Sequence, residues 1–246
     1  MHRFFMEVED AREALEVVLK NSETVNHLVR VLRVKTGEAV EIVTSETAII
    51  GQVSAIGLDS VVVAIQSEEK HANESPIQID LFQCLPKGQK LELIIQKNVE
   101  LGVHGFYLVA SKRCIVDYKP KDVPKKLERL DRIAKEAAKQ SKRDIIPKVH
   151  GILTIKDSIS RIDSYDQFLV LYEREDSEGL KARLAALGGK KIAILIGPEG
   201  GLDQSEVDGL IQAGALSTTL GKRILRTETA GFVAVSCIQY HVGAMG

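Results

Sequence analysis

The sequence of 246 residues contains only three cysteines, six prolines and no tryptophan. Cys84, Cys114 and Cys237 are odd in number and lack metal-ligand spacing, which argues against a disulfide framework and a zinc site. No run of about 18 apolar residues occurs, and the start MHRFFMEVED has no apolar region. We therefore expect neither a membrane-spanning helix nor a signal peptide, and a cytoplasmic protein.

Three motifs that hold common cofactors are also missing. No GxGxxG follows an early strand, no GxxxxGK[ST] occurs, and the six histidines form no helical HxxxH pair. These absences make a dinucleotide fold unlikely, exclude a P-loop and predict no metal. The composition, 44% hydrophobic and 27% charged, is that of an ordinary globular protein.

Charge is unevenly distributed, although the formal net charge is only −1. Residues 1–70 hold seven Lys and Arg against twelve Asp and Glu, whereas residues 111–149 hold thirteen against six. A local basic segment attracts phosphate even when the whole protein is nearly neutral. The sequence is therefore compatible with an RNA partner.

Residues 1–70 read as short strands with one helix between them. Strands are predicted at residues 15–19, 39–43, 48–56 and 60–65. Strands spaced this closely indicate a small PUA-like or OB-like β-barrel over residues 1–71, a frequent RNA-binding scaffold. The polar run at residues 68–75 is the best linker candidate, so residues 72–246 form a second predicted domain.

The helix of the first domain is predicted to start at Ser22. Its apolar stripe comprises Val25, Leu28, Val29 and Leu32. Arg30 and Arg33, three residues apart, would then share a face that can grip phosphate. The same spacing is equally typical of solvated surface arginines.

The second domain alternates strand-like and helical segments. Strands are predicted at 77–85, 106–110, 168–172, 192–196 and 216–220, and helices at about 91–99, 124–143, 178–187, after 203, and from 227 or 229 to 240. This order predicts an α/β domain with a mostly parallel sheet covered on both faces. The helix at 124–143 carries a basic ridge, which suits an RNA backbone but is also usual on a solvated face.

Two glycine-broken loops distinguish the second domain. In KIAILIGPEGG, residues 191–201, a buried strand stops at Gly197 and opens into a helix that Asp203 and Glu206 can cap. In LSTTLGKRILRTETAGF, residues 216–232, Gly221 breaks a second strand before the last helix. Because carboxyl ends of parallel strands meet at one sheet edge, both loops are expected at one ligand site. For the first loop alone, a tight strand-to-helix turn is an equally good interpretation.

Together, GPEGG after a buried strand and LGKRILRTETA before the last helix resemble the signature of the SPOUT class of methyltransferases. Within that class, RILRTETA is similar to the family that methylates N3 of a uridine in bacterial 16S ribosomal RNA, ribosomal RNA small subunit methyltransferase E. The resemblance extends through residues 27–38, 87–103 and 132–148. It implies a C-terminal trefoil knot, S-adenosyl-L-methionine as cofactor, a homodimer, and 16S rRNA of the 30S ribosomal subunit as partner.

The chemistry of the loops, the basic ridge of the helix and the resemblance together assign two groups of residues. Cofactor binding falls to Leu171, Tyr172, Gly197, Pro198, Glu199, Gly200, Gly201, Leu220, Gly221, Ile224 and Leu225. RNA binding falls to Arg3, Arg30, Arg33, Arg132, Lys139, Gln140 and Arg143. In the first group, backbone atoms would read the adenine and apolar side chains would form the walls.

Arg226 is the catalytic candidate for stabilising charge on O2 or O4 of the uracil as N3 loses its proton. Glu228 or Glu199 would accept or position that proton. Pairing of Arg226 with Glu228 merely to hold the loop is a comparable alternative.

Two other functions compete with base methylation. SPOUT enzymes that methylate the ribose 2′-oxygen resemble this chain at GPEGG but typically carry an SLNVS-like third motif, where this sequence has RTETAGF. A non-catalytic RNA-binding or ribosome-assembly factor would keep the fold without turnover, and the intact glycine loops argue against it.

Overall fold

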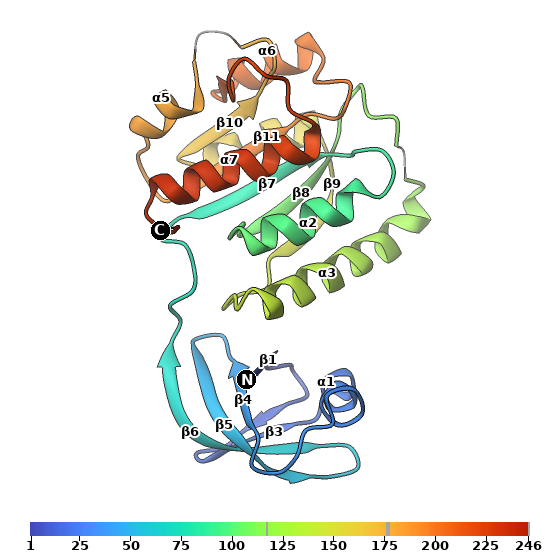
Figure 1. The fold of residues 1–246 in the computed structure, drawn as a ribbon. Coiled ribbons are helices and arrows are strands. Elements are labelled where there is room, and N and C mark those ends of the chain that lie inside the picture. Colours follow the sequence, from blue (N-terminus) through green and yellow to red (C-terminus); the bar gives the residue numbers. More distant parts are fainter. Residues whose placement is uncertain (117, 176–177, 246) are drawn as a thin grey trace. The chain divides into compact units, whose positions relative to one another are not determined.

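The computed structural model describes residues 1–116, 118–175 and 178–245, which divide into two compact units (Figure 1). Unit 1 comprises Met1–Asn73 together with Lys142–Ile145, and unit 2 comprises Glu74–Ser141 and the chain from Ile146 onward. The chain therefore passes between the units three times. The predicted boundary after residue 71 lies close to the first passage, whereas nothing in the sequence predicted the return at 142–145.

Unit 1 is a mixed six-stranded sheet in the order β1-β4-β5-β6-β3-β2. Its strands are β1 His2–Phe5, β2 Ala11–Arg12, β3 Glu16–Leu19, β4 Ala39–Val43, β5 Thr47–Ile56 and β6 Val61–Lys70. Neighbouring strands are antiparallel except β1 and β4, which run parallel. Alternate side chains such as Val40, Ile42 and Val63 point into one core. The four predicted strands are present, but β6 continues to Lys70 through the first part of the expected linker.

The predicted helix of unit 1 is short and changes its winding. Asn21 caps α1 Ser22–Asn26 by accepting a hydrogen bond from the Thr24 N–H at 3.1 Å. The chain continues as a π-helix, η1 His27–Leu32, and Arg33 ends it with a left-handed φ of 54°. The expectation that Arg30 and Arg33 share one regular helical face is therefore wrong, because α-helical spacing does not extend across this segment.

Residues 142–145 are joined to unit 1 through the buried carboxylate of Asp144. Arg3, on β1, forms ion pairs with both Asp144 and Glu41. Asp144 also accepts hydrogen bonds from the backbone N–H groups of Ala72 at 3.1 Å and Asn73 at 2.8 Å. Burial opposes ionisation of Asp144, but the hydrogen bonds from Asn73 and Arg3 outweigh it and lower its pKa.

Unit 2 contains a six-stranded parallel sheet in the order β12-β10-β11-β7-β8-β9. Its strands are β7 Gln78–Cys84, β8 Gly105–Ala110, β9 Lys148–Thr154, β10 Gln167–Leu171, β11 Lys191–Ile196 and β12 Leu216–Thr218. After β9 the chain crosses to the other side of β7, so the order of strand addition reverses there. Such a reversal is where parallel α/β sheets form ligand sites.

Helices cover both faces of this sheet, as predicted. They are α2 Lys90–Glu100, α3 Val123–Gln140, α4 Ile155–Ile159, α5 Leu180–Ala185, α6 Gln204–Gln212 and α7 Thr227–His241, with short 3₁₀ turns η2 Pro120–Asp122 and η3 Ile162–Ser164. Figure 1 shows α2, α3 and α7 along one face, while Val207 and Leu210 of α6 pack against Phe168 and Leu195 on the other. None of the described helices has the length and apolar character that a membrane crossing requires.

Two details of unit 2 differ from the sequence prediction. The helix expected at 124–143 ends at Gln140, and Lys142 takes a left-handed φ of 59° that turns the chain away. Strand β9 and helix α4 were not predicted, although Thr154 and Asp157 form a capping box at the start of α4.

Candidate functional site

The loop after β11 is shaped by its glycines. β11 is buried over Ile192–Ile196, and Gly201 has a left-handed φ of 68°. This backbone conformation favours glycine, and a Cβ atom at Gly201 would lie 2.4 Å from a carboxylate oxygen of Glu173, so a larger residue would be strained and would displace the Glu173 side chain. Asp203 and Glu206 form the predicted capping box at the start of α6, which confirms the strand-glycine loop-helix arrangement.

The loop after β12 is tied to the first loop through Thr227, the first residue of α7. The buried Thr227 hydroxyl donates to the carbonyl oxygen of Gly197 at 2.7 Å and accepts from Gln83 Nε2 at 2.9 Å. Gly221 opens this loop with a left-handed φ of 107° and has free space around its α-carbon. One hydroxyl thus holds the strand end of the GPEGG loop against the start of the last helix.

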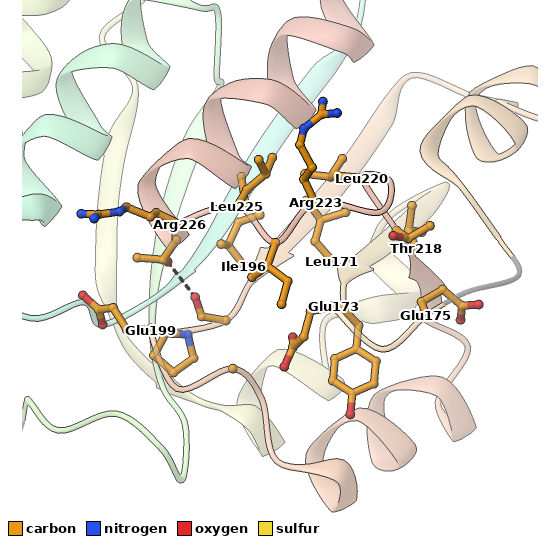
Figure 2. Close-up of a pocket in the computed structure, with 18 of the residues that line it drawn as sticks. Leu171, Glu173, Glu175, Ile196, Glu199, Thr218, Leu220, Arg223, Leu225 and Arg226 are labelled. Atoms are coloured by element: carbon orange, nitrogen blue, oxygen red, sulfur yellow. Dashed lines mark hydrogen bonds between the residues drawn. The ribbon is translucent and has the colours of Figure 1, made fainter.

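The two loops and the end of β10 enclose one cavity of about 900 Å³ (Figure 2). All eleven residues assigned to the cofactor line it, and so does Arg226. Figure 2 shows Leu171, Ile196 and Leu225 gathered at its centre, with Arg226 and Glu199 together on one side. The structure therefore brings the predicted cofactor residues together, and their contact with a cofactor stays a prediction.

Charged groups cluster on the Arg226 side of the cavity. Lys90, the first residue of α2, lies 2.9 Å from Glu199 and 3.4 Å from Glu228. Burial opposes ionisation of Glu199, yet hydrogen bonds from Lys90 and from the backbone N–H groups of Glu199 and Lys87 lower its pKa. Because Glu228 pairs with Lys90 while Arg226 is exposed, the alternative in which Arg226 holds the loop by pairing with Glu228 is wrong.

Several residues around the cavity were not predicted. Arg113 braces the GPEGG loop from outside, donating to the Gly200 carbonyl at 3.0 Å and to Asp203 at 3.3 Å. Further lining residues are Lys90, Glu173, Glu175, Ile196, Thr218, Thr219, Lys222, Arg223, Thr227 and Ala230. Lys90 could have been predicted from its position just after β7, because the carboxyl end of β7 lies at the same sheet edge as both glycine loops.

Two of the thiols, those of Cys84 and Cys114, are in contact near the carboxyl ends of β7 and β8. Cys84 ends β7 and is fully buried, and burial raises its pKa. Cys114, in the loop after β8, is half-buried, and its contact with Cys84, aided by Ser111, lowers its pKa to about 6. The described residues contain no cluster of His, Cys, Asp and Glu arranged to hold a metal ion.

The residues assigned to RNA differ in their surroundings. Arg30, Arg33, Arg132 and Gln140 are exposed, although Arg132 lies 3.5 Å from Glu128. Lys139 is only 16% exposed at its side chain and pairs with Glu136 at 2.9 Å. Arg3 is 7% exposed and Arg143 4%. The structure thus gives Arg3 a packing role in unit 1, and RNA contact by any of the seven stays a prediction.

Comparison with known proteins first shows the class of protein to which the chain belongs. Residues 73–239 match the family model described as an RNA methyltransferase domain, and residues 19–66 match an RNA methyltransferase PUA domain. A PUA unit followed by an α/β unit with glycine loops at one sheet edge is therefore an RNA methyltransferase fold. Ribosomal RNA small subunit methyltransferase E of Bacillus subtilis is 34% identical, with 98% of this chain and 96% of the relative covered. The chain belongs to the ribosomal RNA small subunit methyltransferase E family.

Solved relatives agree over nearly the whole chain. The family member from Neisseria gonorrhoeae, bound to S-adenosyl methionine, has 31% identity and a TM-score of 0.85, with 98% of this chain and 97% of that chain covered. A putative methyltransferase from Legionella pneumophila, also with bound cofactor, has 27% identity and a TM-score of 0.84, with 97% and 96% covered. The predicted PUA-like and α/β organisation is confirmed, and the trefoil passage of the chain stays a prediction.

Proposed function

We propose that this protein transfers a methyl group from S-adenosyl-L-methionine to N3 of a specific uridine in 16S rRNA of the small ribosomal subunit. One observation carries the proposal for this chain. The two glycine loops of the methyltransferase domain meet around a single cavity whose rim holds an exposed cation, Arg226, beside a carboxylate, Glu199. This is the combination that deprotonation of a uracil N3 requires.

The cavity suits the cofactor in size, shape and chemistry. A volume of about 900 Å³ falls within the range of small-molecule sites. Leu171, Ile196 and Leu225 offer apolar walls, while Gly221, with no atom near the position of a Cβ, lets a ligand approach the backbone. The carboxylate of Glu173 lines the same cavity and can accept hydrogen bonds from hydroxyl or ammonium groups of a ligand.

The chain's own residues handle the proton and the charge. Bound S-adenosyl-L-methionine supplies an electrophilic methyl group and leaves as neutral S-adenosylhomocysteine. As the N3–H bond breaks, its electron pair stays on the base, and Glu199 receives the proton. Arg226 donates to O2 or O4, where the negative charge is delocalised, and N3 then forms its bond to the methyl carbon. Of the two candidate acceptors, Glu199 is the one among the described cavity-lining residues.

We further propose that the protein acts in the cytoplasm as a homodimer. Ile224, assigned to the cofactor wall, is 84% exposed, and Tyr240 on α7 is 74% exposed. A second copy that covered these side chains would complete the apolar wall of the cavity and remove them from water. Gly231 and Ala234, by contrast, are buried, and Gly231 packs beside Asn98 and Leu81 of the same chain.

The test is methyl transfer from labelled S-adenosyl-L-methionine to 16S RNA, both free and in assembled 30S subunits, followed by mass spectrometry of the nucleosides. We expect 3-methyluridine, and the comparison of the two substrates identifies the assembly state that is recognised. A ribose-methylated nucleoside, or no product despite cofactor binding, would contradict the proposal.

A further inference from the structure

Lys90 is the cationic side chain of the cavity that is fixed in place by the protein. Its ammonium lies 2.9 Å from Glu199, in the loop after β11, and 3.4 Å from Glu228, in the first turn of α7. The side chain is 30% exposed and lines the cavity. Lys222 and Arg223 also line the cavity, but both are exposed on the loop after β12. A donor held in position before the substrate arrives needs little reorganisation during the reaction.

The ammonium retains at least one N–H for a ligand. Of its three donors, one makes the hydrogen bond to Glu199 at 2.9 Å, and the ion pair with Glu228 at 3.4 Å occupies at most a second among the described residues. The hydrogen bond to Glu199 raises the pKa of Lys90 above its ordinary value, so the group stays charged at neutral pH. The third N–H is therefore a charged donor at the cavity surface.

The chemistry of uracil calls for two donors. Its N3 lies between two carbonyl groups, and loss of the N3 proton delocalises negative charge onto O2 and O4 together. Arg226 can serve one of these oxygens. We propose that Lys90 is a second catalytic cation, which donates a hydrogen bond to the other uracil carbonyl while Glu199 and Glu228 hold it in place. This inference rests on the proposed function of the site.

The charges of the four side chains are consistent with this role. Before reaction, the cations Lys90 and Arg226 balance the carboxylates Glu199 and Glu228. When the N3 proton moves to Glu199, that carboxyl becomes neutral and the base becomes the second anion. Lys90 and Arg226 then face Glu228 and the base, so these two cations face two anions both before and after the proton transfer. The arrangement also favours uracil over cytosine, because cytosine presents an amino donor in place of the C4 carbonyl.

The experiment compares Lys90→Met, Lys90→Arg and a matched control, Lys97→Met. Lys97 lies on the same helix and pairs with Glu100 at 2.9 Å, away from the cavity lining. Each variant is assayed on 16S RNA transcribed with uridine or with 5-fluorouridine, whose N3 proton is more acidic, in the assembly state that the wild type methylates. Affinity for S-adenosyl-L-methionine is measured by calorimetry.

We expect Lys90→Met to lower kcat on uridine RNA about 100-fold, as loss of one charge-stabilising donor does. The loss on 5-fluorouridine RNA should be smaller by about threefold or more, because a more acidic base needs less stabilisation. Lys90→Arg should recover most of the activity, and Lys97→Met should match the wild type. Equal losses on the two RNAs, accompanied by an equal loss of cofactor affinity, would overturn the proposal and leave Lys90 as a clamp between loops.

A second readout uses protein without cofactor. Binding of 5-fluorouridine RNA, followed by fluorescence anisotropy from neutral to mildly alkaline pH, should tighten for the wild type as the base ionises, and tighten less for Lys90→Met. Identical pH dependence in the two proteins would contradict a contact between Lys90 and the ionised base. A wild-type product other than 3-methyluridine would instead overturn the proposed function, and with it the need for two donors, so the product separates the two failures.

Discussion

Replacing Thr227 with valine should loosen the site without changing its shape. The two side chains are nearly isosteric and both are β-branched, so helix geometry and packing are retained. The variant loses the 2.7 Å bond to the Gly197 carbonyl and the 2.9 Å bond from Gln83 Nε2. Gln83 keeps its bond to the Cys84 carbonyl at 2.9 Å, so Gly197 bears most of the change.

The magnitude follows from these two bonds. Each contributes about 1 kcal/mol net, and a carbonyl left without a partner adds about 1–3 kcal/mol, which together gives a loss of about 3–5 kcal/mol in the free energy of unfolding. About 1.4 kcal/mol of this should appear as a tenfold weaker affinity for S-adenosyl-L-methionine, because Gly197 belongs to the cavity wall.

The assay combines denaturant unfolding with calorimetric titration of the cofactor. Thr227→Ser keeps the hydroxyl and should retain most of the affinity, while Thr229→Val makes the same chemical change two residues along α7 and should behave as the wild type. The reasoning would be refuted if the free energy of unfolding of Thr227→Val lay within about 0.5 kcal/mol of the wild-type value and its cofactor affinity were unchanged. Changes that small are typical of substitutions at the protein surface, not of the loss of two buried hydrogen bonds.

Three further predictions follow from other parts of the structure. Arg226→Ala should reduce methyl-transfer turnover about 100-fold while calorimetry shows little change in cofactor affinity, and equal losses of both would remove its assigned role. Because the pKa of Cys114 is lowered to about 6, its alkylation by iodoacetamide, followed by peptide mass spectrometry, should reach half of its maximal rate near that pH; a half-maximal rate reached only near the ordinary thiol value of about 8.5 would contradict this. Asp144→Ala should lower the free energy of unfolding by about 3 kcal/mol at neutral pH. Since the pKa of Asp144 is lowered on folding, the stabilisation by Asp144 is present above about pH 4 and is lost as the pH falls further. The unfolding free energies of the wild type and the variant, measured over an acid titration, should therefore converge.

Elements with local signals were predicted well from the sequence. β4 was predicted with its observed bounds, and the start of α6 followed from Asp203 and Glu206, which lie three residues apart and cap each other. The glycine loops were also readable, because positive φ at Gly201 and Gly221 is a property of the residue itself. The meeting of both loops at one cavity followed from the parallel order of the strands.

What the sequence did not reveal depends on contacts between distant residues. No role was predicted for Lys90, since the carboxylates that hold it lie far along the chain, Glu199 being 109 residues away. Arg3 was predicted to contact RNA, and its ion pair with Asp144 was missed because Asp144 is 141 residues away. Residue type and spacing alone do not distinguish a buried ion pair from a solvated charge, and this is where assignment of RNA-contacting arginines is weakest.

The return of residues 142–145 to unit 1 has a consequence for how this protein can be divided or recombined. A fragment ending at Asn73 would lack the Asp144 carboxylate and would leave the Arg3 guanidinium and the N–H groups of Ala72 and Asn73 without this shared acceptor. The N-terminal part is therefore not an exchangeable cassette. A chimaera that replaces residues 1–73 by a single crossover would take Arg3 from one parent and Asp144 from the other. Residues 1–73 and 142–145 are therefore expected to be transferred, and to diverge, together.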